Sequence, residues 1–204
     1  MAVSLNANAL IDATELETFL QVTIASTDFK NTIINVASDF IERFANRKLI
    51  ATTYTDEEYD GNFDNYIYLK NYPVSSTDTF TLKNWDIYNN SLLYTYTIHT
   101  EYTVYYNEGI IYVYGKTGKG HRNYRVTYKA GWAIANVPYD LKFACAQLSG
   151  LVYYHKGKTG IQSESMGNYS INYGSNNKAS AMFMGIPVSD EIAGIIANYR
   201  RVNV

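Results

Sequence analysis

The N-terminal part of the chain carries apolar residues at helical spacing. Thr14 and Glu17 have the spacing of a capping box, in which each side chain satisfies a free backbone amide, so a short helix is predicted there. A second helix is predicted after the Ser26-Thr27-Asp28 cluster, ending near Arg47. Its apolar positions recur every three or four residues and form one stripe: Ile33, Ala37, Phe40, Ile41 and Phe44.

The middle of the chain, residues 49–132, changes to the two-residue period of β-strands. Short β-branched or aromatic runs alternate with turn formers such as Asp60-Gly61-Asn62 and Asn107-Glu108-Gly109. The predicted strands are 66–69, 80–82, 92–98, 102–106, 110–114 and 124–128. This pattern is typical of an antiparallel β unit inserted between helices.

Helical spacing returns at Val137-Pro138 and continues to about His155. Cys145 falls on the apolar stripe of this helix, which favours a core position over a catalytic nucleophile. Residues 156–187 are rich in Gly, Ser and Asn and keep neither period, so we expect a long loop or extended arm. A last short helix is predicted with Ser189 as its N-cap. Its apolar face and basic end consist of Ile192, Ile195, Ile196, Tyr199, Arg200 and Arg201.

Together these elements predict an α+β fold. Residues 1–48 and 133–204 form a small helical bundle with a long C-terminal arm, and the antiparallel β unit of residues 49–132 is the insertion. The switch in period at both boundaries motivates this division. We expect the helices before Arg47 and after Pro138 to pack together.

Composition narrows the possible functions. The 204 residues include 17 basic and 19 acidic ones, and a formal net charge of -2 argues against a dedicated DNA- or RNA-binding protein. A single cysteine and three scattered histidines exclude an internal disulfide and a Cys/His metal cluster. Without a secretory pattern or a long apolar run, we expect a soluble intracellular protein with no cofactor and no membrane partner. The 21 tyrosines suit sheets and protein interfaces.

Two segments of opposite charge lie in the β unit. Residues 115–132 contain no acid, and their basic residues are Lys116, Lys119, Arg122, Arg125 and Lys129. An acidic cluster lies in a stretch without Lys or Arg: Asp56, Glu57, Glu58, Asp60 and Asp64. A nucleic-acid surface is one interpretation of the basic segment, and a solvated hairpin or an interface with an acidic neighbour is favoured. We expect the acidic cluster to form a solvated loop and the two segments to pair between copies of the subunit. The candidate subunit-interface residues are Lys116, Lys119, Arg122, Arg125, Asp56, Glu57, Glu58 and Asp60.

The chain lacks the residue patterns of common enzymes. There is no Gly-x-Ser-x-Gly elbow and no His-Glu-x-x-His helix, and the three histidines, His99, His121 and His155, are predicted in separate elements. The acidic cluster could supply a carboxylate pair for sugar hydrolysis, so a small hydrolase is an alternative. The prediction is that the protein is not an enzyme.

Several short motifs follow one another in a characteristic order. They are Phe40-Ile41-Glu42-Arg43-Phe44-Ala45-Asn46-Arg47, Tyr59-Asp60-Gly61, Tyr68-Leu69-Lys70-Asn71-Tyr72-Pro73-Val74, Arg125-Val126-Thr127-Tyr128-Lys129-Ala130-Gly131-Trp132, Val137-Pro138-Tyr139-Asp140-Leu141-Lys142, the arm 160–170 and Ile195-Ile196-Ala197-Asn198-Tyr199-Arg200-Arg201. In this order they resemble the head-tail connector, or adaptor, proteins of tailed bacteriophages over nearly the whole chain. The β unit is longer and richer in Tyr than the insertion usual in that family.

This resemblance implies a virion structural protein of the neck, assembled in the host cytoplasm. Such adaptors form a ring, commonly of twelve copies, that docks on the portal protein and also meets the next neck or tail protein. DNA passes through the channel without sequence-specific binding. Portal docking in relatives tends to use the C-terminal segment. The portal-binding candidates are therefore Ile192, Ile195, Ile196, Tyr199, Arg200 and Arg201.

Two alternatives stay open. The Tyr-rich β unit also suits a recognition or decoration module that binds glycan and needs no portal. The last helix is too short to be stable alone in water, so its apolar face needs a partner surface. That surface is either the portal or the protein's own helical bundle.

Overall fold

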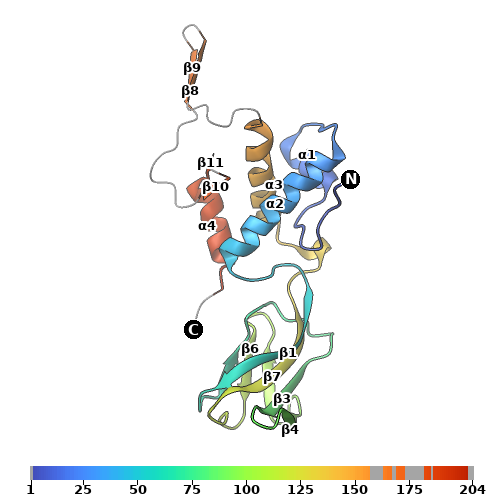
Figure 1. The fold of residues 1–204 in the computed structure, drawn as a ribbon, viewed down its shortest axis with the longest axis vertical. Coiled ribbons are helices and arrows are strands. Elements are labelled where there is room, and N and C mark those ends of the chain that lie inside the picture. Colours follow the sequence, from blue (N-terminus) through green and yellow to red (C-terminus); the bar gives the residue numbers. More distant parts are fainter. Residues whose placement is uncertain (1, 157–162, 167–168, 173–181, 185, 202–204) are drawn as a thin grey trace. The chain divides into compact units, whose positions relative to one another are not determined.

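The computed structural model describes residues 2–156, 163–166, 169–172, 182–184 and 186–201. The chain divides into two compact units (Figure 1). The helical unit comprises Met1–Asn46 and Asn136–Arg200, and the β unit comprises Arg47–Ala135 and the end of the chain from Arg201. Helices in one unit and antiparallel sheets in the other confirm the predicted α+β fold.

The described part of the helical unit contains four α-helices. They are α1 (Ala13–Leu20), α2 (Thr27–Ala45), α3 (Tyr139–Tyr154) and α4 (Asp190–Asn198), and a short 3-10 helix, η1 (Ile134–Asn136), precedes α3. Helix α3 contacts the other three, and α2 also contacts α1 and α4. The helices from the two ends of the chain therefore pack together, as the sequence predicts.

The contact faces of these helices are apolar. Their completely buried side chains include Leu16, Ile34, Ala37, Ile41, Leu141, Ala144 and Leu148. Cys145 is buried among them, with its sulfur 3.5 Å from the Ser38 hydroxyl, which confirms its core position. Gly150 lets α1 and α3 approach closely, because a Cβ at this position would lie 2.9 Å from Leu20 Cδ2.

The first helix is capped by a different residue from the one predicted. Asp12, and not Thr14, accepts hydrogen bonds from the backbone N–H groups of Thr14 and Glu15, both at 2.8 Å, while Glu15 accepts from the Asp12 N–H. Glu17 instead accepts from the Ile24 N–H at 2.7 Å, which lowers its pKa. Both Asp12-x-x-Glu15 and Thr14-x-x-Glu17 fit the capping-box pattern, so the sequence does not distinguish them. The Asp12 carboxylate caps the helix because it accepts hydrogen bonds from two backbone amides, whereas a hydroxyl would accept from one. The predicted N-cap Ser189 is confirmed, and Ser26 caps α2, which begins within the Ser26-Thr27-Asp28 cluster and not after it.

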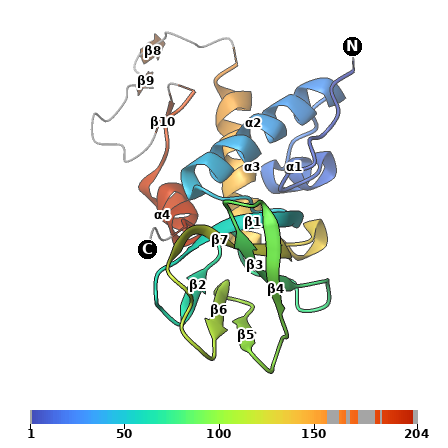
Figure 2. The ribbon, with the colours of Figure 1, turned by 60° about the horizontal axis from the view of Figure 1, so that its bottom comes forward.

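Two antiparallel sheets form the β unit (Figure 2). The larger has the order β1-β7-β3-β4, with β1 (Thr52–Gly61), β7 (Gly120–Ala130), β3 (Thr81–Asp86) and β4 (Ser91–Tyr96). The smaller has the order β2-β6-β5, with β2 (Tyr66–Tyr68), β6 (Ile110–Val113) and β5 (Tyr102–Tyr105). Both contribute to one apolar core, which includes Ile67, Val104, Ile111, Leu82, Val126 and Tyr128.

Two predictions of local structure are wrong. The acidic cluster lies largely in strand β1 and not in a loop, because pairing with β7 holds this charged segment extended. The segment 156–187 was expected to lack regular structure, but its described part contains four short strands: β8 (Ser163–Met166), β9 (Tyr169–Asn172), β10 (Met182–Phe183) and β11 (Ile186–Pro187). They pair as β8 with β9 and β10 with β11. The rest of the quoted arm, including residues 160–162 and 167–168, lies outside the described residues.

Candidate functional site

The acidic cluster and the basic segment face each other on neighbouring strands of one subunit. Glu58 on β1 pairs in register with Arg125 on β7, and its carboxylate contacts the guanidinium groups of Arg125, at 3.5 Å, and Arg122. Asp60 accepts a hydrogen bond from the Arg122 backbone N–H at 2.6 Å and lies 3.0 Å from His121 Nδ1. These contacts lower the pKa of Asp60, the Arg122 hydrogen bond most strongly.

Asp56 and Glu57 also have partners in their own subunit. The Asp56 carboxylate lies 2.8 Å from Lys83 Nζ, and this contact lowers the pKa of Asp56. The Glu57 carboxylate accepts hydrogen bonds from the hydroxyls of Tyr59 and Tyr128, the latter at 2.6 Å. Burial, with a smaller contribution from this carboxylate, raises the pKa of both tyrosines. The carboxylates that sugar hydrolysis would need are therefore engaged in structural contacts.

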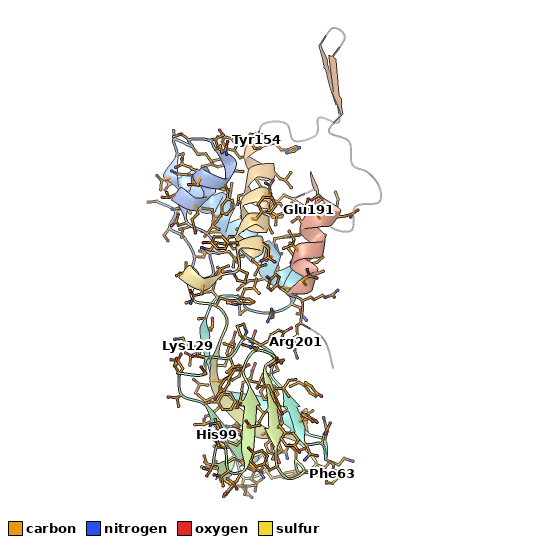
Figure 3. All side chains as sticks on the ribbon, turned by 180° about the vertical axis from the view of Figure 1, so that it is seen from behind. Phe63, His99, Lys129, Tyr154, Glu191 and Arg201 are labelled. Atoms are coloured by element: carbon orange, nitrogen blue, oxygen red, sulfur yellow. The ribbon has the colours of Figure 1, made fainter. Side chains whose placement is uncertain are left out.

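Most of these charged residues already have partners in their own subunit, so they are no longer expected to pair between copies. Arg122 and Arg125 bind acids of their own subunit, and Lys129, labelled in Figure 3, lies 3.3 Å from Asp78. Lys116 and Lys119 are exposed and take part in no ion pair among the described residues. A role at a subunit interface stays a prediction, best supported for these two lysines. The sequence suggested two separate surfaces because it did not reveal that β1 lies beside β7.

The apolar face of α4 lies against the protein's own helices. Ile192 is 8% exposed and Ile196 is 0% exposed, and α4 contacts α2 and α3. Of the two alternatives for this face, the structure shows docking on the helical bundle. The physical reason is that a nine-residue helix gains its stability from tertiary packing. Ile192 and Ile196 therefore already have the partner surface that the portal was expected to provide.

The polar end of α4 is tied to the start of α3. The Tyr199 hydroxyl lies 2.8 Å from both carboxylate oxygens of Asp140 and donates its hydrogen bond to that group. Arg200 is exposed, whereas Ile195 and Arg201 are half-buried. Glu191, in the first turn of α4, is exposed (Figure 3). Portal binding by the C-terminal segment stays a prediction. It now concerns those residues of the segment that are not buried against the helical bundle.

An apolar pocket of about 400 Å³ opens between α2 and β10. It is lined by Val36, Phe40, Arg43, Phe44, Met182, Phe183 and Met184. Phe183 is buried, with its ring centre 4.9 Å from that of Phe40, while Met182 and Met184 are exposed. Because methionine side chains adapt to irregular shapes, this pocket suits an apolar side chain of a partner. The helical spacing predicted that Phe40 and Phe44 lie on the apolar face of this helix. It did not indicate that β10 would lie beside them.

One face of the smaller sheet carries five tyrosines, of which four are exposed and one, Tyr112, is half-buried. Alternation along the strands directs Ile67, Val104 and Ile111 into the core and the tyrosines outward. This set, named the Tyr face, consists of Tyr66, Tyr68, Tyr105, Tyr112 and Tyr114. Register places Tyr66 opposite Tyr112 with ring centres 5.2 Å apart, and Tyr112 and Tyr114 have ring centres 5.9 Å apart. The five side chains form an aromatic surface without a charged member.

The edge of the larger sheet carries a second apolar surface. It is named the apolar knob and consists of Ile87 and Tyr88 in the turn between β3 and β4 and of Leu92 and Leu93 on β4. Tyr88 is 98% exposed and Leu93 is 59% exposed. The sequence predicted a strand over these leucines but did not show that it would be an edge strand.

Neither a metal centre nor a membrane span is found in the part of the chain that the structure describes. No group of three or more His, Cys, Asp or Glu residues there could hold a metal ion. No helix there is both long enough and apolar enough to cross a membrane.

Comparisons with known proteins point to one family. Residues 9–202 match the model of a family described as head completion protein. The fold is similar to that of a chain in the solved "Neck of empty GTA particle computed with C6 symmetry", with 14% identity, a TM-score of 0.53 and coverage of 100% of this chain and 95% of the other. It is also similar to a chain in "Virion of native gene transfer agent (GTA) particle", with 15% identity, a TM-score of 0.51 and coverage of 99% and 94%. A comparison with curated proteins finds no match.

Proposed function

Because the chain belongs to the head completion protein family, we propose that it is a structural adaptor in the neck of a tailed virion, where it joins the DNA-filled head to the tail. The family match over residues 9–202 carries this proposal. It agrees with the adaptor family that the sequence motifs resemble. A fold shared with a chain from a particle neck supports the same location. In this role the protein holds other proteins together and catalyses no reaction.

The adaptor works as a ring of identical copies through which DNA passes. The six-fold symmetry named for the similar neck structure supports a cyclic arrangement, and the resemblance to adaptors favours twelve copies. A ring requires each copy to meet its two neighbours with two different surfaces. The net charge of -2 fits a channel wall that does not hold DNA tightly.

The helical unit contacts the portal. Its apolar pocket beside Phe40 and Met184 can receive an apolar side chain, and Arg200 can pair with acidic groups of the portal, as can Arg201, which follows the helical unit in the chain. The buried residues Ile192 and Ile196 support this surface from inside the bundle. The next neck or tail protein meets another surface of the ring.

Particles assembled without this protein test the proposal. We expect packaged heads and free tails that do not join, and adding the purified protein should restore tailed particles, counted by electron microscopy, and their ability to deliver DNA. Thr100→Glu, at an exposed turn position, is a control that should restore joining as well as the wild type does. Tailed, DNA-delivering particles formed in the absence of the protein would reject the adaptor role.

A further inference from the structure

The Tyr face and the apolar knob are two exposed aromatic or aliphatic surfaces of one β unit. Tyr66, Tyr68, Tyr105 and Tyr114 of the Tyr face are between 42% and 49% exposed. None of the five tyrosine hydroxyls makes a hydrogen bond to another described residue. Large aromatic side chains that stay uncovered mark interaction surfaces, because covering them removes much apolar area from water.

The apolar knob is held in a fixed shape. The Asp86 carboxylate accepts hydrogen bonds from the backbone N–H groups of Tyr88 and Asn89, at 2.9 and 3.2 Å, and from the Asn89 side chain at 2.7 Å. The Trp85 indole N–H donates to Asn90 at 3.2 Å. The turn therefore presents Tyr88 to solvent without a large loss of conformational freedom on binding.

The charges that border the two surfaces are complementary. Lys116 and Lys119 follow Tyr114 at one end of the Tyr face and are exposed without an ion-pair partner among the described residues. Asp86 lies at the base of the apolar knob, and among the described residues no lysine or arginine lies within ion-pair distance of it. A contact between the two surfaces would thus bring unpaired cations of one toward an unpaired carboxylate of the other.

We propose that the Tyr face of one copy packs against the apolar knob of the next copy in the ring. This inference rests on the proposed adaptor function. A cyclic ring needs two different, complementary surfaces on each subunit, and the two sheets of the β unit supply them. Tyr88 inserts among the tyrosine rings, Leu92 and Leu93 cover the neighbouring part of the sheet, and Lys116 and Lys119 face Asp86. The remaining charges of the acidic and basic strands stay paired inside each subunit.

Two blocking variants test this contact in the full chain. Tyr68→Glu with Tyr105→Glu blocks the Tyr face, and Tyr88→Glu with Leu93→Glu blocks the apolar knob. All four side chains face solvent, so both variants should fold, which circular dichroism and thermal unfolding check. Asn62→Glu with Thr100→Glu adds the same charge at exposed turn positions and is the matched control.

The association of these proteins is measured by sedimentation velocity and native mass spectrometry. We expect the wild type and the control to associate with rising concentration, and each blocking variant to associate at least about tenfold more weakly. Mixing the two blocking variants should give a one-to-one dimer and nothing larger, because one intact Tyr face then meets one intact knob and no further surface is left. Rings formed normally by either blocking variant, a wild type that stays monomeric, or a mixture without dimer would each overturn the inference.

Failure of the proposed interface and failure of the proposed adaptor role give different experimental outcomes. Blocking variants that restore head-tail joining as well as the wild type would reject this interface and leave the adaptor function standing. Failure of the wild type itself to restore joining would reject the function. If both blocking variants associate normally and only the Tyr-face variant loses retardation in an affinity gel that contains dextran, the Tyr face binds glycan and not a second copy.

Discussion

The guanidinium of Arg47 lies over the Tyr72 ring, 3.8 Å from its centre, and its Nη1 donates a hydrogen bond to the Tyr72 carbonyl at 2.6 Å. The Trp132 ring centre is 5.4 Å from the same guanidinium. Beside this group, the Trp132 N–H donates to the Leu49 carbonyl at 2.8 Å and the Ala51 N–H donates to the Trp132 carbonyl at 2.9 Å. The chain segments that begin and end the β unit are therefore fastened to each other at its base.

This base depends on Gly131, which has a φ of +105°. A Cβ there would lie 2.6 Å from the backbone carbon of Ile50, so the segment could not keep its pairing. We expect Gly131→Ala to lower the free energy of unfolding by about 2–4 kcal/mol, since both backbone strain and a backbone clash oppose it.

Urea unfolding followed by tyrosine and tryptophan fluorescence measures this change. Gly115→Ala is the matched control, because a Cβ at Gly115 meets nothing within 4 Å, and its effect should stay within about 0.5 kcal/mol. Equal stability of the two variants would show that the base of the β unit is not held as described.

The sequence predicts those features that depend on local spacing. The stripe from Ile33 to Ile41 gives α2, and the Ser189 side chain marks a helix start that the structure confirms. The order of the motifs also indicated the adaptor family, which the match to the head completion protein family confirms.

The candidate site was harder to predict because it depends on contacts between distant residues. The sequence shows that Glu58 and Arg125 have opposite charges, but their 3.5 Å contact follows from the pairing of β1 with β7. Likewise, the helical spacing of apolar residues shows that Ile196 lies on a face that must pack against another surface. It does not tell whether that surface is α3 or another protein. The Tyr face requires β2 and β5 to lie on either side of β6, a strand order that no local pattern specifies.

The buried tyrosines predict a loss of stability in alkali. Burial raises the pKa of Tyr102 to about 12, and burial also raises the pKa of Tyr59 and Tyr128. An unfolded tyrosine ionises near pH 10, where these folded ones still hold their protons. Above about pH 10 the unfolded state therefore binds fewer protons than the folded state, and the free energy of unfolding falls as pH rises.

Urea unfolding between pH 8 and pH 11.5 checks this slope. Tyr128→Phe should cost about 1–2 kcal/mol at neutral pH through the lost hydrogen bond to Glu57, and it should make the alkaline slope shallower. Tyr88→Phe, at an exposed position, should change neither quantity. An alkaline slope that Tyr128→Phe leaves unchanged would contradict the role of this tyrosine.

The burial of Cys145 predicts that its thiol reacts only when the protein unfolds. It is completely buried, and burial raises its pKa to about 12, so little thiolate is present at neutral pH. The rate of reaction with a colorimetric disulfide reagent should follow the rate of opening of the helical unit. Because the chain has one cysteine, the signal has a single source. Rapid native modification at neutral pH would mean that α2 and α3 do not close over it.

Two variants distinguish the packing of α4 on the helical bundle from the binding of its C-terminal end to the portal. Ile196 is completely buried where α4 meets α2 and α3, so Ile196→Ala should lower the free energy of unfolding by about 2–5 kcal/mol. Arg200→Glu with Arg201→Glu should change stability by less than about 1 kcal/mol, because neither side chain belongs to the buried core, and should weaken binding to the portal.

Thermal unfolding and co-sedimentation with purified portal rings give the two readouts. The adaptor role with α4 docked on its own bundle requires the isoleucine variant to lose stability and the arginine variant to lose portal binding. Glu191→Lys, at the exposed start of α4, shows whether any charge change on this helix has the same effect on binding. If Ile196→Ala instead keeps full stability and abolishes co-sedimentation, α4 leaves the bundle and its isoleucine face meets the portal directly.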